Sequence, residues 1–297
     1  MEQSDSPRVT PRGDLLAIKE IVAMEQYLDL ARYPMHKPEC SSAQSLVASC
    51  QHDYNTLGMF NLSGLVLTEA VRECVAGIQP LLDTDSYVHC RDHNIYFDDG
   101  FSELDPNHPA LSILHTENRK ICADQFTENL ITRIYEWRPL IDFIATVLEK
   151  PQLHTMDDPL ARINVMEYSA GQVLNWHFDR AEFTTTLLLQ NATSGGEFQY
   201  RAELRSDEDP NYDGVGLMLA GQDDQVKTVP LIPGTLNVFQ GRNSAHRITP
   251  VSGTKSRIIA VFSYYETPGA AFSDKERLYF YGRIGKQVGH VNERLSG

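Results

Sequence analysis

The sequence predicts a mostly β fold, a cupin-like double-stranded β-helix or jelly roll, with a helical N-terminal part packed against it. Three observations predict this fold class. From residue 160 onward, short strand-like runs alternate with Gly, Pro, Asp and Asn turn signals. The number of runs, about eight, suits a barrel made of two sheets. Before residue 160, apolar residues recur at helical spacing instead.

The N-terminal part is predicted to hold three helical segments separated by irregular stretches. Residues 15–32 have apolar side chains at helical spacing, and Thr68 is a suitable N-cap for a second helix. A third helical stretch covers residues 126–150, with a predicted break at Pro139. Residues 84–123 are rich in polar and turn-forming residues, which favours either a solvated loop or a lid over a site.

The predicted strands of the second part are short and separated by turns. They lie at residues 162–168, 173–179, 184–190, 196–201, 226–231, 235–240, 245–251 and 256–266. The acidic interval 202–225 is predicted to be an insert at one end of the barrel. In the tail, aromatic residues at 279–281 would either pack or close the site from the barrel rim.

These elements predict one catalytic domain rather than two. Residues 1–13 are polar and are expected to be disordered, and residues 14–297 are expected to form a single unit. Its expected parts are a helical and lid part (14–159), a jelly-roll core (160–268) and a C-terminal extension (269–297).

Composition excludes several classes of partner. The 297-residue chain carries a net charge of −14, which argues against binding to nucleic acid or to anionic membranes. No apolar run approaches the roughly 20 residues of a membrane span, and the first residues do not form a secretory signal. The five cysteines are widely spaced, which favours free thiols in a reducing compartment and hence a cytoplasmic location. The oligomeric state stays open.

Residues 175–179 (NWHFD) contain the strongest chemical signal in the chain. In a strand, His177 and Asp179 point to the same face and present an imidazole beside a carboxylate. With His246 from a later predicted strand, they would form the two-histidine, one-carboxylate triad of non-haem Fe(II) oxygenases. His115 and Glu117 also have the His-x-acid spacing, but no strand pattern surrounds them.

Arg257 opens an apolar predicted strand eleven residues after His246. A buried arginine needs an anion, and the distal carboxylate of 2-oxoglutarate would supply one. In this order the four residues resemble the signature of the Fe(II)/2-oxoglutarate-dependent dioxygenases.

Further matches place the resemblance more narrowly, in the BesD/HalD-like group, whose members act on free amino acids. They lie at residues 158–159, 164–165, 171, 176–179, 188–190, 195–198, 233–236, 239–242, 246–251 and 281–283. Halogenating members carry Gly where this chain has Asp179. The resemblance therefore implies Fe(II), 2-oxoglutarate and O₂ as cofactor and cosubstrates, and hydroxylation or another hydrogen-abstracting oxidation of a small molecule rather than chlorination.

Contacts to the cosubstrate and the substrate follow less directly. Asn164 and Tyr168 share a strand face and are candidates for binding 2-oxoglutarate beside Arg257. Substrate candidates, chosen by position, are Arg180, Ser263, Tyr281 and Arg119. Arg180 stands where lysine-acting relatives carry an acidic residue, which favours an anionic or neutral substrate. The alternative functions are a prolyl-type hydroxylase of protein side chains and a non-catalytic metal-binding jelly-roll protein.

Overall fold

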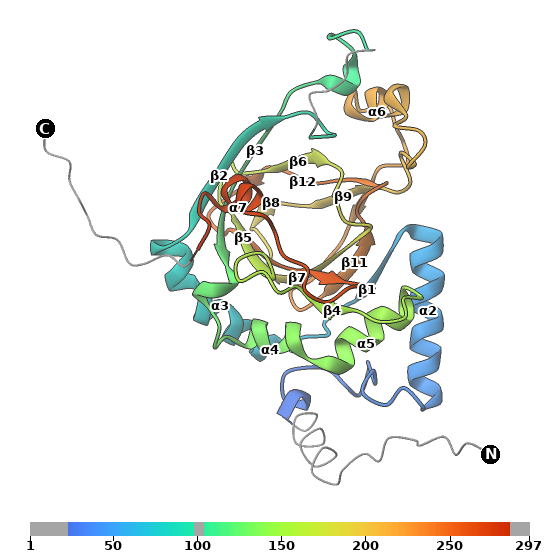
Figure 1. The fold of residues 1–297 in the computed structure, drawn as a ribbon, viewed down its shortest axis with the longest axis vertical. Helices are drawn as coiled ribbons and strands as arrows, with labels where there is room; N and C mark the ends of the chain where they lie inside the picture. The colour runs from blue at the N-terminus through green and yellow to red at the C-terminus, as the bar shows by residue number, and fades with distance from the viewer. Residues whose placement is uncertain (1–22, 98–103, 286–297) are drawn as a thin grey trace, which may run out of the picture.

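The computed structural model describes residues 23–97 and 104–285, and two antiparallel sheets dominate them (Figure 1). The larger sheet has the strand order β1-β11-β7-β14-β5-β3-β2, and the smaller one has the order β10-β9-β12-β6. The large-sheet strands are β1 (Met59–Leu62), β2 (Tyr87–His93), β3 (Leu114–Cys122), β5 (Ile163–Tyr168), β7 (Phe183–Gln190), β11 (Leu236–Gln240) and β14 (Arg257–Phe262). The small-sheet strands are β6 (Leu174–His177), β9 (Phe198–Arg201), β10 (Lys227–Val229) and β12 (Ala245–Ile248).

Two shorter pairs extend this framework. Strand β13 (Val251–Ser252) pairs with β8 (Ser194–Gly195), and β15 (Tyr264–Tyr265) pairs with β4 (His154–Thr155). All the strand runs predicted after residue 160 are present, with ends shifted by a few residues. The predicted insert 202–225 contains the helix α6 (Tyr212–Leu219).

Helices cover the outer face of the large sheet. They are α2 (Ser41–Leu57), α3 (Thr68–Thr84), α4 (Leu130–Glu136) and α5 (Arg138–Val147), and Figure 1 shows α3, α4 and α5 in a row along one side of the strands. The break between α4 and α5 falls at Trp137, two residues before Pro139, as predicted. Short 3₁₀ turns precede and follow β3 at Pro109–Leu111 and Ala123–Gln125.

The core has two principal layers. Apolar side chains of the helices pack on the outer face of the large sheet, where Ile121, Val165 and Ala260 contribute from three strands. A second cluster fills the space between the sheets, with Tyr168 and Ile259 from the large sheet meeting Phe198 from the small one. Residues of β5 and β14 therefore alternate between the helical layer and the space between the sheets.

Three N-terminal expectations need correction. The predicted loop or lid at 84–123 contains β2 and β3, which pair along their whole length and extend the large sheet. Within the described residues, the helix predicted at 15–32 ends at Glu25, and Leu28 instead forms a bridge with Val66. Thr68 is the first residue of α3, which begins after Leu67 without a side-chain cap. The expectation for residues 1–13 lies outside the described residues.

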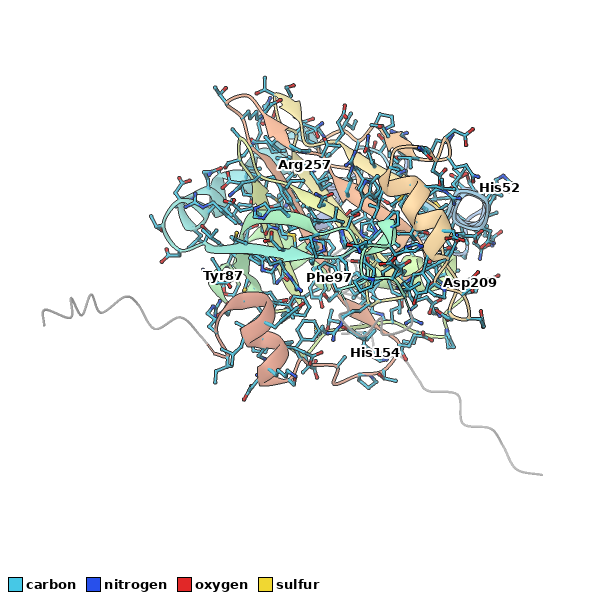
Figure 2. All side chains as sticks on the ribbon, turned by 90° about the horizontal axis from the view of Figure 1, so that it is seen from above. His52, Tyr87, Phe97, His154, Asp209 and Arg257 are labelled. Carbon is cyan, nitrogen blue, oxygen red and sulfur yellow. The ribbon has the colours of Figure 1, made fainter. Side chains whose placement is uncertain are left out.

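The C-terminal helix α7 (Asp274–Tyr281) lies against the edge strand β2. Figure 2 shows Tyr87 of β2 beside this helix, and the contact is close: a Cβ added at Gly282 would lie 2.6 Å from the Tyr87 ring. A Ser273–Glu276 capping box fixes the start of α7. Helix α7 thereby forms a wall beside the inner face of β2 and β3.

Candidate active site

The three predicted metal ligands meet at one point of the small sheet. His177 ends β6 and lies directly opposite His246 of β12, and Asp179 follows two residues after His177. The Nε2 atom of His177 is 3.5 Å from Oδ1 of Asp179, and the Nε2 atom of His246 is 3.3 Å from Oδ2. Ligands about 2.1 Å from one ion lie about 3 Å apart when they meet at right angles, so the three side chains are placed to share an ion.

Backbone carbonyls orient both imidazoles toward the centre. Nδ1 of His177 donates to the carbonyl of Asn175 at 2.8 Å, and Nδ1 of His246 donates to that of Ser244 at 3.1 Å. With the proton on Nδ1, each Nε2 carries a free lone pair for a metal. Burial, followed by the neighbouring His246, lowers the pKa of His177, which keeps its ring neutral.

The carboxylate of Asp179 is held in its ionised form. Burial would raise its pKa, but the two histidines outweigh burial and hold the pKa of Asp179 well below its usual range. The hydroxyl of Thr184 donates to Oδ2 at 2.5 Å. This outer partner orients the carboxylate in the way that ligating carboxylates generally require.

Arg257 has the unsatisfied donors that an anion site needs. Its side chain lies between the sheets at 2% exposure, directly opposite Tyr168 in the neighbouring strand. Nη1 donates to Oδ1 of Asn191 at 3.2 Å, whereas Nε and Nη2 are buried with no hydrogen-bond partner among the described residues. Burial lowers the pKa of Arg257 to about 10. A carboxylate bound in the guanidinium fork would satisfy both free donors.

Asn164 and Tyr168 share the inner face of β5, as predicted, but differ in availability. The amide nitrogen of Asn164 donates to the carbonyls of Leu160 and Ile163, and its Oδ1 accepts from the Tyr281 hydroxyl at 2.8 Å. Asn164 therefore ties β5 to α7. Tyr168 is fully buried beside Arg257, and its hydroxyl contacts only the sulfur of Met166, at 3.3 Å.

Two predicted substrate contacts lie in other surroundings. The side chain of Arg180 is 73% exposed and pairs with Glu276 of α7 at 3.0 Å. Ser263 follows β14, where its hydroxyl donates to the carbonyl of Ala161 and its own carbonyl accepts from the Tyr135 hydroxyl. Both sets of contacts join elements of the protein to one another.

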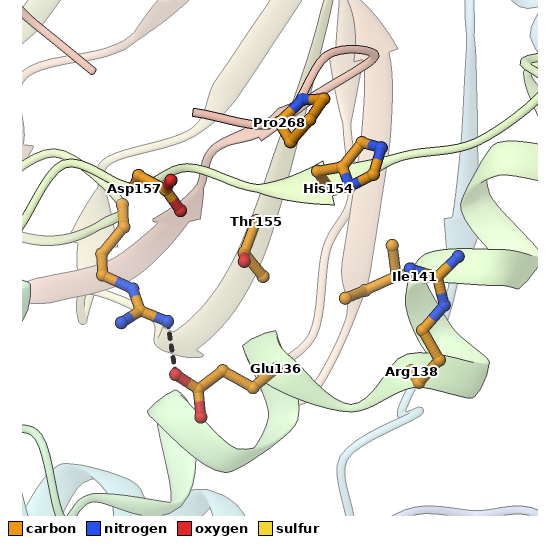
Figure 3. A pocket seen from close by; sticks show the side chains of 8 residues that line it. Glu136, Arg138, Ile141, His154, Thr155, Asp157 and Pro268 are labelled. Atoms are coloured by element: carbon orange, nitrogen blue, oxygen red, sulfur yellow. Dashed lines mark hydrogen bonds and ion pairs between the residues drawn. The ribbon is translucent and has the colours of Figure 1, made fainter. Parts of the chain in front are cut away.

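A cleft of about 320 Å³ lies near the Ser263 end of β14 (Figure 3). Both of its arginines pair with protein carboxylates, Arg162 with Glu136 and Arg138 with Asp142. The cleft contains none of the predicted site residues. The backbone carbonyl of Arg162, which lines this cleft, accepts the backbone N–H of Ser263, and this bond supports a structural role for the region.

Arg119 and its neighbour Lys120 point to opposite faces of β3. Arg119 lies opposite Glu167 of β5, on the face where Ile121 packs against the helices. Lys120 lies opposite Met166 on the inner face, and it is 4% exposed. Arg119, predicted as a substrate contact from the lid segment, thus lies on the outer face of β3, and its neighbour Lys120 occupies the inner face.

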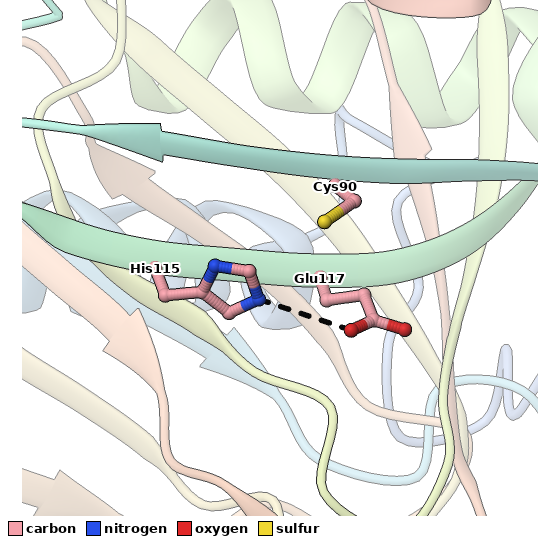
Figure 4. A group of neighbouring side chains, drawn as sticks. All are labelled: Cys90, His115 and Glu117. Carbon is pink, nitrogen blue, oxygen red and sulfur yellow. Dashed lines mark ion pairs between the residues drawn. The ribbon is translucent and has the colours of Figure 1, made fainter.

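The second His-x-acid pair belongs to the outer face of β3. His115, Glu117 and Cys90 lie close enough to form a metal-sized group (Figure 4), but they are exposed or half-exposed. His115 is also held by a hydrogen bond to Asp92 at 2.8 Å. The His177 group has the burial and the carbonyl-oriented imidazoles that this group does not have.

Four polar residues of β2 and β3 escaped the sequence reasoning: Lys120, Asn118, Arg91 and His89. The structure shows the alternation of a strand, since 116, 118 and 120 are buried while 115, 117 and 119 are not, but the sequence carries no apolar alternation that would reveal it. Thr116 links this face to the metal strand, because its hydroxyl oxygen accepts the N–H of Asn175 at 3.0 Å.

The antiparallel sheets, the His-Asp-His group and the unsatisfied arginine together define an Fe(II)/2-oxoglutarate-dependent oxygenase. Solved structures share this fold. The nogalamycin carbocyclase SnoK matches with a TM-score of 0.54 and 12% identity over 80% of this chain and 93% of its own. HygX from Streptomyces hygroscopicus, solved with nickel and 2-oxoglutarate bound, matches with a TM-score of 0.51 and 13% identity over 75% and 88%.

Residues 42–272 match the family model of halogenase D, which is most of the chain. The protein therefore belongs to the halogenase D family, within the Fe(II)/2-oxoglutarate-dependent oxygenases. It is an oxidoreductase that uses Fe(II), 2-oxoglutarate and O₂. No curated protein sequence matches it. Among residues 23–97 and 104–285, no helix is both long and apolar enough to cross a membrane.

Proposed function

We propose that this protein hydroxylates an unactivated C–H bond of a free amino acid or a similar small metabolite, with release of succinate and CO₂. The position of the Asp179 carboxylate is the observation that supports the proposal most strongly. Its carboxylate stands between the Nε2 atoms of His177 and His246 and accepts the Thr184 hydroxyl. A glycine at this position would leave the third protein ligand absent, which is the arrangement that the resemblance associates with halogenation.

Separate groups of residues would hold the metal and the cosubstrate. His177, Asp179 and His246 would hold Fe(II) through three protein ligands, which leaves positions for small ligands. Arg257 would bind the distal carboxylate of 2-oxoglutarate through Nε and Nη2, with Tyr168 beside it. When bound, the iron and 2-oxoglutarate supply the oxidising power for attack on C–H. The protein orients the substrate and excludes water.

The finer architecture belongs to the same proposal. The order β5, β6, β7, β9, β10, β11, β12 and β14 across two facing sheets supports a double-stranded β-helix within residues 160–268. The helical part and the C-terminal extension would complete one catalytic domain over 14–297. A cytoplasmic location is proposed as well, and the five cysteines, all free, support it.

Of the rival functions, a non-catalytic metal binder has the weaker support. A protein that only binds a metal has no need for a buried arginine with two unsatisfied donors next to the metal ligands. A prolyl-type hydroxylase of protein side chains would use the same metal and cosubstrate groups, so the substrate screen must separate it.

The test has two stages. Under anaerobic conditions, Fe(II) plus 2-oxoglutarate should give the weak visible charge-transfer band of the chelate, and Asp179→Ala and Arg257→Ala should each weaken it. The twenty standard amino acids are then screened aerobically for substrate-dependent succinate formation, with product mass as the second readout. A protein without the band, or one that releases succinate only with a peptide, would contradict the proposal.

A further inference from the structure

The inner face of β2 and β3 is polar and lies next to the metal centre. Thr116, Asn118 and Lys120 alternate along this face of β3, and all three are buried. The residues opposite them on β2 are Arg91, His89 and Tyr87, in that order. The contact from Thr116 to Asn175 joins the face to β6, two residues before the metal ligand His177.

Two of these buried side chains have a polar group without a hydrogen-bond or ion-pair partner in the described residues. Lys120 is 4% exposed, and its ammonium lies 5.9 Å from the centre of the Tyr281 ring. Within residues 23–97 and 104–285 it forms neither a hydrogen bond nor an ion pair. Asn118 is 1% exposed, and its Oδ1 has no hydrogen-bond partner in the same part of the chain. Buried charges and carbonyls are normally paired, so this site is built for something that pairs with them.

A second cation shares the face. The guanidinium of Arg91 lies between two aromatic rings, 4.8 Å from the centre of Phe97 and 4.4 Å from that of Tyr279. It has no ion pair among the described residues. The two rings fix its position without neutralising its charge.

The field on this face is therefore positive. Between the two cations, His89 is neutral, because burial and then the charges of Lys120 and Arg91 lower its pKa to about 3. Among the carboxylates that the structure describes, Asp158 pairs with Arg277 and Asp124 with Arg283. Two uncompensated cations with a neutral imidazole favour an anion.

The face is also within reach of the metal centre. The guanidinium of Arg91 lies over the ring of Phe97, and the centre of this ring is 5.8 Å from that of the His177 ring. Tyr281, which covers Lys120, donates to Asn164 on the inner face of β5. A molecule held between Lys120 and Arg91 would thus lie on the large sheet beside β6, the small-sheet strand that carries His177.

We propose that Lys120, Arg91 and Asn118 bind the substrate, and that this substrate is an acidic amino acid or a similar small dicarboxylate. Its carboxylates would pair with Lys120 and Arg91, and Oδ1 of Asn118 would accept from its ammonium or another donor. A dibasic amino acid would place a second ammonium on this face, where no described carboxylate is free to pair with it. The inference rests on the proposed function and names the substrate class of that site.

The experiment is a calorimetric titration of the protein loaded with Ni(II) and saturating 2-oxoglutarate, so that binding is read without turnover. The probes are L-aspartate, L-glutamate, L-leucine and L-lysine. The variants are Lys120→Met, Lys120→Arg and, as a matched control, Arg180→Met, which removes a cation from the exposed surface. An acidic probe should bind wild type and the control most tightly. Lys120→Met should weaken that binding at least tenfold, and Lys120→Arg should restore part of it.

Several outcomes would overturn the inference. They are tighter binding of L-lysine than of either acidic probe, binding of an acidic probe that Lys120→Met leaves unchanged, and no binding of either acidic probe to wild type. Titration of 2-oxoglutarate itself distinguishes failure of the proposed function from failure of the substrate inference. If wild type fails to bind 2-oxoglutarate, the proposed function fails. If Lys120→Met binds 2-oxoglutarate normally and still binds the acidic probe as wild type does, only the substrate inference fails.

Discussion

The backbone of Gly241 packs directly against the carboxylate of Asp179. A Cβ at position 241 would lie 2.6 Å from Oδ2 of Asp179 and 2.8 Å from the Thr184 hydroxyl. The carbonyl of Gly241 also accepts the N–H of Asp179 at 2.9 Å. Gly241, the residue after β11, thus limits the space around the carboxylate of Asp179, the third proposed metal ligand.

Gly241→Ala should therefore damage the metal centre without touching a ligand. The added methyl group must displace the carboxylate or its Thr184 partner, and disturbing such outer contacts typically costs 10–100-fold in metal affinity. Metal content after dialysis and Fe(II) titration would measure the loss. Gly285→Ala is the control, because a Cβ there meets nothing within 4 Å. Equal iron affinity in the two variants would show that the Gly241 contact has no role.

Asp179→Gly tests what decides the reaction outcome. Removing the carboxylate leaves two histidines as protein ligands, so iron affinity should fall and hydroxylation should fall with it. Added chloride should recover some iron binding by taking the vacated position, with at most a trace of chlorinated product, because substrate placement is unchanged. Mass analysis of products with and without chloride measures both. Undiminished hydroxylation without chloride would mean that Asp179 is not an essential ligand.

Arg257→Lys and Arg257→Met test the cosubstrate anchor. Lysine keeps the charge but loses the fork, and methionine loses both, so 2-oxoglutarate affinity should fall in that order. A charge-assisted bond contributes about 1.5–3 kcal/mol, which corresponds to roughly a 10–100-fold loss for methionine. Arg257→Met should also unfold at a higher temperature than wild type without ligand, because two unsatisfied buried donors are removed. Unchanged 2-oxoglutarate titrations would place the anchor elsewhere.

Lys120 should make stability depend on pH in a defined window. Burial lowers its pKa to about 8, against 10.5 when exposed, so the unfolded chain binds more protons between these values. The destabilisation is complete below about pH 8 and is relieved as pH rises toward 10.5. About 2.5 pH units at 1.36 kcal/mol each correspond to about 3 kcal/mol. Urea unfolding of wild type and Lys120→Met should give free energies that converge across this window. A constant difference would contradict the prediction.

The sequence carried most of the information for the core strands and the metal ligands. Strands such as β5, β7 and β14 bury both faces, and apolar runs at 187–189 and 258–262 mark two of them. His177 and Asp179 are two residues apart in such a context, which fixes their common direction. Local pattern and ligand spacing agree, and the structure brings His246 to the same point.

The inner face of β2 and β3 could not be recognised in the same way. Its buried positions carry Thr116, Asn118 and Lys120 instead of apolar residues, so the apolar alternation that identifies a half-buried strand is absent. These polar residues made a strand of the large sheet look like a loop. The register of β3 was the second property that the sequence did not reveal. A shift of one residue exchanges the sheet faces on which Arg119 and Lys120 lie.

The wall formed by α7 has a consequence for how the protein is made. Tyr281 follows His246, the last metal ligand, by 35 residues, so a ribosome adds α7 roughly 2–7 s later at about 5–20 residues per second. All three metal ligands and Arg257 are synthesised before the helix that covers Lys120 exists. The part of the chain that covers the proposed substrate site is therefore synthesised after every residue proposed to hold the iron and 2-oxoglutarate.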